Sequence, residues 1–233
     1  MKILAMADIH CRFEQFYPSL LPHAHLVIVA GDITDRGMRS PMEMEAAKTW
    51  FQLLSQRYPR VFYIPGNHDI GCDNGTFIEQ NWWPQNVYGI NQIKVICESK
   101  GPKEEGKLKF YGVSLTTAYN LPDLVKHWAY MTAHPQLEKE AFNFEPVDVV
   151  ISHGPPFGIL DKAGVDLRTR EMVHVGSPEL LTYIQRHQPR LVICGHAHGN
   201  EGEVMVGKTR VVNVAERWEL IDLPFRQEDS QEV

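Results

Sequence analysis

The sequence predicts an α/β (α+β) fold in which a mixed β-sandwich is flanked by helices. Five short apolar runs rich in β-branched residues, two segments of helical periodicity between them, and several later runs of alternating polarity predict it. At 233 residues, of which 43% are hydrophobic and 22% charged, the chain has an ordinary globular composition. We therefore expect a single domain over residues 1–233.

The apolar runs are expected to be strands buried on both faces, each ending where a polar cluster begins. They are Lys2–Ala7, Leu26–Ala30, Val61–Ile64, Val147–Ser152 and Leu191–Cys194. Apolar residues at helical spacing predict a helix over Pro41–Tyr58, with Ser40 as its cap. A second Ser-Pro start predicts a helix over Ser177–His187. Because helices connect these strands, parallel pairing follows.

The remaining runs alternate more cleanly and are expected to be antiparallel strands. They are Ile93–Cys97, Leu108–Val113, Glu203–Val206, Arg210–Val214 and Trp218–Leu223. Gly207-Lys208 predicts a tight turn between two of them, and the polar end Glu228–Val233 is expected to fray.

Charge and composition exclude several classes of function. The net charge of −6 and the lack of a Lys/Arg run argue against an extended nucleic-acid surface. No apolar stretch reaches the roughly 20 residues needed to span a bilayer, and the apolar N-terminal run is too short for a signal peptide. Cys11, Cys72, Cys97 and Cys194 are scattered, as is typical of reduced thiols. We expect a soluble, cytoplasmic protein without a membrane partner.

Five polar motifs carry the chemistry, and four of them directly follow an apolar strand. They are Asp8-Ile9-His10, Gly31-Asp32-Ile33-Thr34-Asp35-Arg36-Gly37, Gly66-Asn67-His68-Asp69, Ser152-His153-Gly154 and Gly195-His196-Ala197-His198. Parallel strand ends meet at one edge of a sheet, so these motifs are expected to converge. Carboxylate, imidazole and amide ligands without thiolate suit Mn, Fe or Zn.

The motifs predict a centre with two metal ions. Such a centre needs an anionic ligand that bridges two cations about 3.5–4 Å apart, and Asp32 is the candidate. The Asp-x-His and His-x-His pairs suit neighbouring terminal ligands because alternate residues of an extended segment point the same way. Three of the motifs begin with glycine, which lets the chain turn sharply as it leaves the strand and leaves no side chain to obstruct close approach of other groups.

In these motifs and their order the chain resembles the calcineurin-like metallophosphoesterase superfamily, with its D-x-H, G-D-x-x-D, G-N-H-D/E, H and G-H-x-H signature. The resemblance covers about the whole chain and implies that family's four-layer architecture. It implies two divalent or trivalent ions, Mn, Fe or Zn. One ion would be held by Asp8, His10, Asp32 and His198, and the other by Asp32, Asn67, His153 and His196.

The same resemblance assigns catalytic roles. His68 would not bind metal but would act as acid or electrostatic stabiliser, with Asp35 oriented towards it, while a metal-bridging hydroxide attacks phosphorus. An imidazole supported by a carboxylate can protonate a leaving alkoxide. Arg36 matches the phosphate-contacting arginine of the Ser/Thr phosphatases, whose Gly-Asp-x-x-Asp-Arg-Gly this chain reproduces.

Ser152-His153-Gly154-Pro155-Pro156 and Ile221-Asp222-Leu223-Pro224 further resemble the small MPPED-type branch, which implies a phosphodiesterase. The expected partner is a small phosphate ester, nucleotides included. A phosphomonoesterase related to the Ser/Thr phosphatases is the alternative, and a non-catalytic scaffold on the same fold is a second one. A scaffold would not need His68 and Asp35, and both are present.

Other residues admit two interpretations. Arg168 and Arg170 either clamp a second phosphate or are solvated, and His174, in the expected substrate loop Gly158–Gly176, either binds substrate or lies at the surface. The large aromatics either stack on substrate or cover a core edge; they are Trp82, Trp83 and Trp128. Asp69 is expected to brace its motif. The thiols near the motifs, Cys11 and Cys72, are expected to line the site rather than to react.

Overall fold

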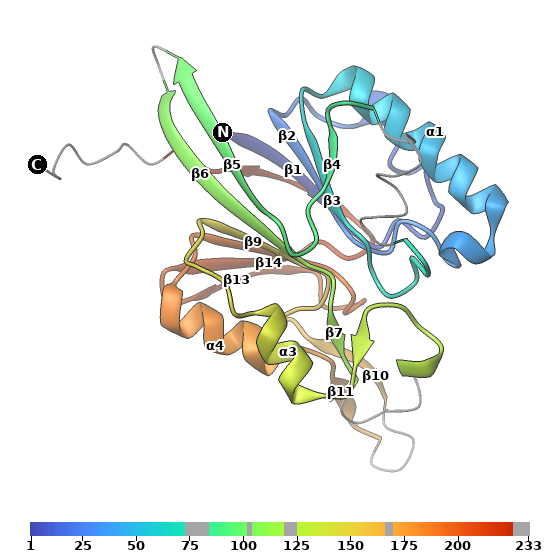
Figure 1. The fold of residues 1–233 in the computed structure, drawn as a ribbon, viewed down its shortest axis with the longest axis vertical. Coiled ribbons are helices and arrows are strands. Elements are labelled where there is room, and N and C mark those ends of the chain that lie inside the picture. The colour runs from blue at the N-terminus through green and yellow to red at the C-terminus, as the bar shows by residue number, and fades with distance from the viewer. Residues whose placement is uncertain (73–83, 102–103, 119–124, 166–169, 226–233) are drawn as a thin grey trace, which may run out of the picture.

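The computed structural model describes residues 1–72, 84–101, 104–118, 125–165 and 170–225. Two mixed β-sheets pack face to face, and helices cover their outer faces (Figure 1). The layers follow one another as helix, sheet, sheet and helix. The mixed sandwich flanked by helices is therefore confirmed, together with its four layers.

The first sheet has five strands in the order β15-β1-β2-β3-β4. Their bounds are Lys2–Met6 for β1, Leu26–Ala30 for β2, Val61–Ile64 for β3, Val87–Gly89 for β4 and Trp218–Asp222 for β15. Strands β1 to β4 run parallel, and β15 pairs antiparallel with β1. The parallel strands are nearly continuous apolar runs, as expected for strands covered on both faces.

The second sheet has six strands in the order β13-β14-β12-β9-β6-β5. Their bounds are Lys94–Gly101 for β5, Glu104–Val113 for β6, Val149–Ser152 for β9, Leu191–Cys194 for β12, Gly202–Val206 for β13 and Thr209–Asn213 for β14. The predicted antiparallel pairing of β6 and β14 is confirmed on one side of each strand, and on the other side each strand also pairs parallel. Each pairs antiparallel with the edge strand next to it and parallel with its inner neighbour, because the hairpins extend a parallel centre.

Two of the helices begin at the Ser-Pro pairs. Helix α1 (Pro41–Arg57) starts after Ser40, whose hydroxyl accepts the N–H of Glu43, and α4 (Pro178–His187) starts after Ser177, whose hydroxyl accepts the N–H of Leu180. Proline at the first helical position fits because its missing N–H has no partner there in any case. The sequence did not predict α3 (Pro135–Ala141) or the short 3-10 turns η1 (Pro18–Leu20) and η2 (Gly37–Arg39).

Three apolar clusters hold the layers together. The central cluster lies between the sheets and joins residues such as Ile28 and Ile193. A second cluster packs α1 residues, Trp50 among them, against the outer face of the first sheet. The third packs α4 residues such as Leu180 against the second sheet. Burial of these side chains is the main stabilising contribution, at about 25 cal/mol per Å² of apolar surface.

Two small sheets lie beside the carboxyl ends of the central strands (Figure 1). One pairs β7 (Thr116–Thr117) with β8 (Met131–Thr132), and the other pairs β10 (Lys162–Val165) with β11 (Met172–His174). The expected loop Gly158–Gly176 therefore contains a hairpin. In the described part of the chain no helix combines the length and apolarity that crossing a membrane requires. Several predicted features lie outside the described residues, namely Trp82, Trp83, Arg168 and the tail Glu228–Val233.

Candidate metal centre

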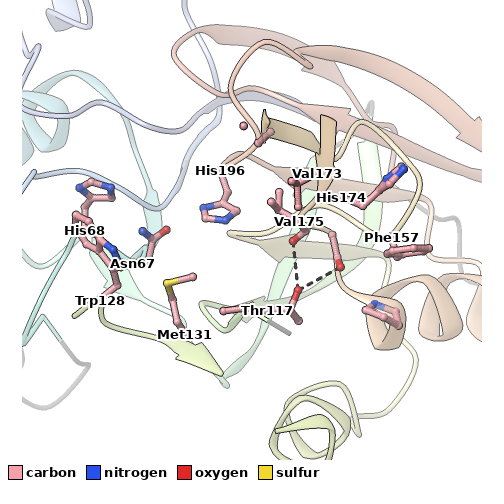
Figure 2. Close-up of a pocket in the computed structure, with 15 residues that line it drawn as sticks. Asn67, His68, Thr117, Trp128, Met131, Phe157, Val173, His174, Val175 and His196 are labelled. Atoms are coloured by element: carbon pink, nitrogen blue, oxygen red, sulfur yellow. Dashed lines mark hydrogen bonds between the residues drawn. The ribbon is translucent and has the colours of Figure 1, made fainter. Parts of the chain in front are cut away.

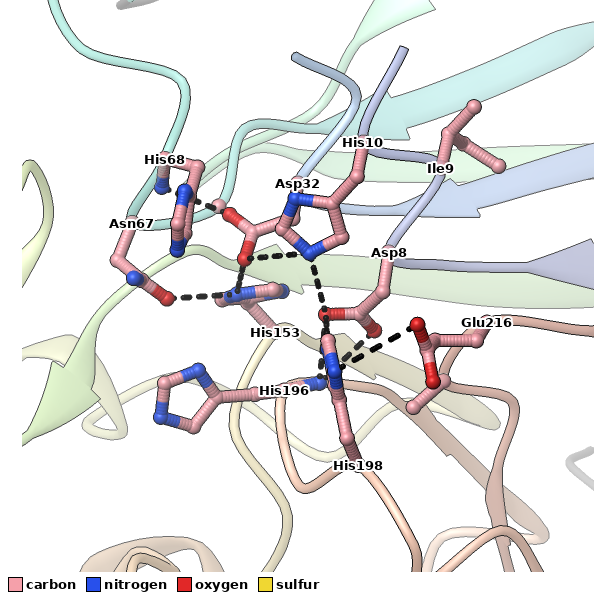
Figure 3. Close-up of polar contacts among 12 residues, drawn as sticks. Asp8, Ile9, His10, Asp32, Asn67, His68, His153, His196, His198 and Glu216 are labelled. Carbon is pink, nitrogen blue, oxygen red and sulfur yellow. Dashed lines mark hydrogen bonds and ion pairs between the residues drawn. The ribbon is translucent and has the colours of Figure 1, made fainter. Parts of the chain in front are cut away.

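The motif residues converge at the carboxyl edge of both sheets (Figure 3). Asp8 follows β1 and Asp32 follows β2 in the first sheet, while His153 follows β9 and His196 follows β12 in the second. Asp8, Asp32 and His196 have left-handed backbones, with φ of 56°, 50° and 65°. Such conformations cost about 1–3 kcal/mol each and concentrate at functional sites.

Asp8, His10 and His198 form the first candidate metal group. The Nε2 atom of His10 is buried without a hydrogen-bond partner. It lies 3.9 Å from Asp8 Oδ1 and 3.8 Å from Asp32 Oδ2. These distances are too long for hydrogen bonds, but they suit ligand atoms that each lie about 2 Å from a shared cation. The orphaned nitrogen therefore fits a metal ligand.

Asp32, His153 and His196 form the second group. Asp32 Oδ1 accepts the N–H of His68 at 2.8 Å, which directs the other carboxylate oxygen inward. That Oδ2 lies 3.3 Å from His153 Nε2, and Asn67 Oδ1 lies 3.0 Å from the same nitrogen. Asp32 thus faces both groups through one oxygen, as a bridging ligand must.

Hydrogen bonds set the ligand tautomers. His153 Nδ1 is 2.8 Å from the carbonyl oxygen of Ala30, and His10 Nδ1 is 2.9 Å from Asp35 Oδ1. Because these oxygens only accept, Nδ1 carries the proton in each ring and Nε2 is left to bind metal. Burial lowers the pKa of His196 to about 4, so this ring is neutral at pH 7, as a metal ligand needs to be.

The buried carboxylates also fit bound cations. Asp8 is 0% and Asp32 is 2% exposed, and within the described residues their partners are imidazoles and main-chain N–H groups. Burial alone would raise the pKa of Asp32, but the neighbouring imidazoles of His153, His68 and His10 together outweigh it and the pKa is lowered. Buried anions require pairing or coordination, so the donor set fits metal.

Two glycines allow the sheets to approach this closely. A Cβ atom on Gly66 would lie 2.3 Å from Asp32 Oδ1, and one on Gly195 would lie 2.2 Å from Asp8 Oδ2. Both distances are below any van der Waals contact, so a side chain at either position would displace a carboxylate. The expectation that glycine serves close approach here agrees with the structure.

The predicted carboxylate–imidazole pair between Asp35 and His68 is absent from the structure. The carboxylate of Asp35 contacts His10, and His68 Nδ1 instead lies 3.2 Å from the main-chain oxygen of Asp35. The turn after Asp32 is held by Glu43, which accepts the N–H groups of Asp35 and Arg36. This turn fixes where the Asp35 side chain points.

His68 lies at the edge of the centre and packs against Trp128, with ring centroids 4.1 Å apart. It also forms a third possible metal group with His10 and Asp32. Its assignment as a group that binds no metal stays a prediction. Trp128 therefore contacts an imidazole of the site rather than covering a core edge.

Two residues of the site had no motif to reveal them. Glu216 Oε1 lies 3.8 Å from His198 Nδ1, and Arg12 Nη1 donates to the same carboxylate at 2.7 Å. Arg12 also donates to the main-chain oxygen of Asp8. Glu216 and Arg12 stand 204 positions apart in sequence, so only folding brings them together. Together they support the His198 side of the centre.

The remaining predicted residues differ in whether they line the pocket beside the centre. His174 lines a pocket beside the centre, with its Nδ1 2.8 Å from Asp161 Oδ1. Arg36 and Arg170 are exposed and are not among the described residues that line this pocket. All four cysteines are free, and burial raises the pKa of the Cys11 thiol to about 12, which argues against a nucleophile. Neither Cys11 nor Cys72 lines the pocket.

Asp69 braces the motif loops, and its removal is expected to destabilise the protein. Its buried carboxylate accepts the N–H groups of Ile33, Thr34 and Gly66. Asp69→Ala leaves these donors unsatisfied at about 1–3 kcal/mol each, so we expect a loss of roughly 3 kcal/mol or more. Urea denaturation measures this loss. The exposed Asp222→Ala is the control, and a loss below about 1 kcal/mol for Asp69→Ala would contradict the bracing role.

A family model described as calcineurin-like phosphoesterase matches residues 1–200, so the chain belongs to that family. It is 28% identical over 231 residues to metallophosphoesterase domain-containing protein 1 of Homo sapiens, covering 92% of this chain and 65% of that protein. The predicted resemblance to MPPED-type proteins is thereby confirmed. The chain spans about 65% of this relative's length.

Two further comparisons agree with this family. A probable glycerophosphodiester phosphodiesterase, GpdQ of Arcobacter nitrofigilis, is 28% identical over 189 residues, covering 77% of this chain and 59% of that protein. The crystal structure of phosphopantetheinyl hydrolase from Mycobacterium tuberculosis gives a TM-score of 0.60 at 15% identity, covering 93% of this chain and 89% of that one. The latter similarity concerns the fold alone.

Proposed function

We propose that this protein hydrolyses phosphodiesters with two metal ions held by the motif residues. The observation that carries the proposal is the buried, unpartnered Nε2 of His10, which points between the carboxylates of Asp8 and Asp32 beside an open pocket. Asp8, His10 and His198 would hold one ion; Asn67, His153 and His196 would hold the other; and Asp32 would bridge them. Bound metal would supply charge to polarise the phosphoryl oxygens and an activated hydroxide.

The chain's own residues would then orient the substrate and move the proton. His68 lines the pocket at its metal end, where its imidazole can protonate the departing oxygen. The main-chain oxygen of Asp35 holds Nδ1, and Trp128 packs on the ring, so that Nε2 is directed away from both. Asp35 itself would orient the metal ligand His10.

Charge favours a diester over a monoester. A diester is a monoanion, whereas a monoester dianion benefits from additional arginines that clamp its oxygens. The described pocket lining contains no arginine, and Arg36, the residue that favoured a protein phosphatase, is exposed outside it. The similarity to a probable glycerophosphodiester phosphodiesterase supports the same choice.

A panel of matched esters tests this proposal. We expect the metal-loaded protein to hydrolyse methyl p-nitrophenyl phosphate with a kcat/KM at least about tenfold above that for p-nitrophenyl phosphate, because the centre offers cations but few arginines. The two substrates share one leaving group, so the ratio reports the charge of the ester. Protein treated with chelator is the control. A monoester preference of about tenfold would favour a phosphomonoesterase, and inactivity towards both would favour the scaffold alternative.

A further inference from the structure

A pocket of about 570 Å³ opens directly from the metal centre. Asn67, His68 and His196 form one end of it, and the pocket extends from them towards Phe157 and His174 (Figure 2). Its volume lies within the range of about 300–1,000 Å³ typical of sites for small organic ligands. A phosphate bound at the metal ions would therefore project its organic group into this space.

The walls beyond the metal centre are predominantly apolar. They come from segments far apart in sequence: the β7–β8 region, the β10–β11 hairpin and the start of α4. The apolar side chains among them include those of Ala118, Trp128, Met131, Phe157, Val173 and Val175. The pocket therefore presents imidazoles at one end and apolar surface along the rest of its described wall.

Two polar side chains in these walls, Thr117 and His174, bind protein partners. The hydroxyl of Thr117 donates to the carbonyl oxygens of Val175 and Gly176, at 3.3 and 3.2 Å. The Nδ1 atom of His174 is held by the buried carboxylate of Asp161. Among the described lining residues there is no Lys, Arg, Asp or Glu. Against the described part of this wall, a charged group would lose its water without gaining a counter-charge.

The aromatic residues in the described part of the lining do not form a cage for a cation either. Such a cage surrounds a quaternary ammonium with several ring faces. Here Trp128 lies at the metal end against His68, while Phe157 lies at the opposite end beside His174 (Figure 2). The two rings contribute apolar surface at separate places.

We propose that this pocket binds an uncharged, largely apolar organic group of the phosphate ester and thereby selects the substrate class. This inference rests on the proposed function of the metal centre. It excludes substrates whose second group is a quaternary ammonium, a carboxylate or a further phosphate. It also assigns specificity to Met131 and Val173, which lie on elements that the motifs do not include.

Two isosteric diesters test the inference. Both carry p-nitrophenol as leaving group; one has a 3,3-dimethylbutyl group and the other a choline group, which differ in one central atom and one positive charge. We expect kcat/KM for the 3,3-dimethylbutyl ester to exceed that for the choline ester by about tenfold or more, since only the choline ester has to bring an ammonium group out of water into an apolar wall. Equal values or a preference for choline would overturn the inference.

Hydrolysis of methyl p-nitrophenyl phosphate distinguishes a failure of the pocket proposal from a failure of the proposed function. If methyl p-nitrophenyl phosphate is hydrolysed but the isosteres do not differ, the pocket proposal fails and the phosphodiesterase proposal stands. If no diester is hydrolysed, the proposed function fails. Two diesters without a p-nitrophenyl group give a second readout of binding when each is tested as an inhibitor of methyl p-nitrophenyl phosphate hydrolysis. Bis(3,3-dimethylbutyl) phosphate is expected to inhibit at about tenfold lower concentration than dimethyl phosphate, because its branched groups bury apolar surface in the pocket.

A negative charge in the pocket wall should weaken the preference for the uncharged organic group. Val173→Asp is expected to lower the ratio of kcat/KM for the 3,3-dimethylbutyl ester to kcat/KM for the choline ester by about tenfold or more. Its carboxylate attracts the ammonium of choline, whereas an apolar group would displace water from the carboxylate without replacing its hydrogen bonds. The ratio does not depend on how much of the preparation is folded. Met131→Asp is the second variant, and Val204→Asp, on the exposed edge strand β13, is the matched control with an unchanged ratio. A ratio unchanged in both pocket variants would contradict the assignment.

Discussion

Asp32→Asn is expected to abolish metal-induced stabilisation and to lower kcat/KM by roughly 10²–10⁴-fold, the equivalent of several kcal/mol of charge stabilisation. Asp32 Oδ2 faces both His10 and His153, and the amide loses the charge with which a bridging ligand holds two cations. Metal at about 100-fold its dissociation constant should raise the stability of the parent protein by ~2.7 kcal/mol. That corresponds to a Tm shift of roughly 5–10 °C.

Thermal unfolding with and without Mn, Zn or Fe, together with metal analysis, measures this effect. We expect about two metal ions per chain in the parent protein and fewer in Asp32→Asn. Asp148→Asn is the matched control because it removes a buried carboxylate that precedes β9, at the opposite end of the strand. A parent stoichiometry that stays at one or below after reconstitution would disprove the dinuclear centre.

His68→Ala is expected to keep the metal ions and yet lose roughly 10²–10⁴-fold in kcat on alkyl esters with poor leaving groups, the range of general acid catalysis. Its ring lines the pocket beside the candidate metal centre, and Nδ1 faces the main-chain oxygen of Asp35. The loss should be much smaller with p-nitrophenolate, which departs without a proton. Comparing the two leaving groups therefore distinguishes acid catalysis from a defect in binding.

Metal content decides the alternative role of His68. Because His68 can also be grouped with His10 and Asp32, a metal ligand in this position would show a lower stoichiometry in His68→Ala. His134→Ala replaces an exposed histidine at the start of α3 and should change neither metal content nor rate. If His68→Ala lost metal and slowed all substrates equally, His68 would be a ligand and not the acid.

The Asp35 result changes how the site is understood. The family resemblance implied a carboxylate behind His68, but in the structure that carboxylate lies 2.9 Å from His10 Nδ1. Asp35→Asn is therefore expected to perturb His10, the proposed metal ligand, before it perturbs His68, the proposed proton donor. Sequence spacing placed Asp35 in the right loop. It could not say which of two adjacent imidazoles the side chain reaches, since their rings lie only 4.8 Å apart.

The sequence by itself determined the central strands, the helices at the Ser-Pro pairs, the family and the residue types at the carboxyl edge. These features depend on consecutive residues: apolar runs that end in polar motifs, helix caps, and glycines such as Gly66 at which the Asp32 carboxylate lies close to the main chain. Because parallel strand ends share an edge, the convergence of the motifs also followed from local patterns.

The tertiary structure alone decided how the site is completed. It brought Glu216 and Arg12 to His198, turned Asp35 to His10, left Arg36 outside the pocket, and assembled the apolar wall from Met131 and Val173. Glu216, Arg12, Met131 and Val173 carry no motif, and where the motif residues Asp35 and Arg36 point depends on the turn that holds them. All of these positions depend on left-handed backbone turns and on packing between segments far apart in the chain. A contact of this kind is set by the sum of many long-range interactions, which no local pattern records.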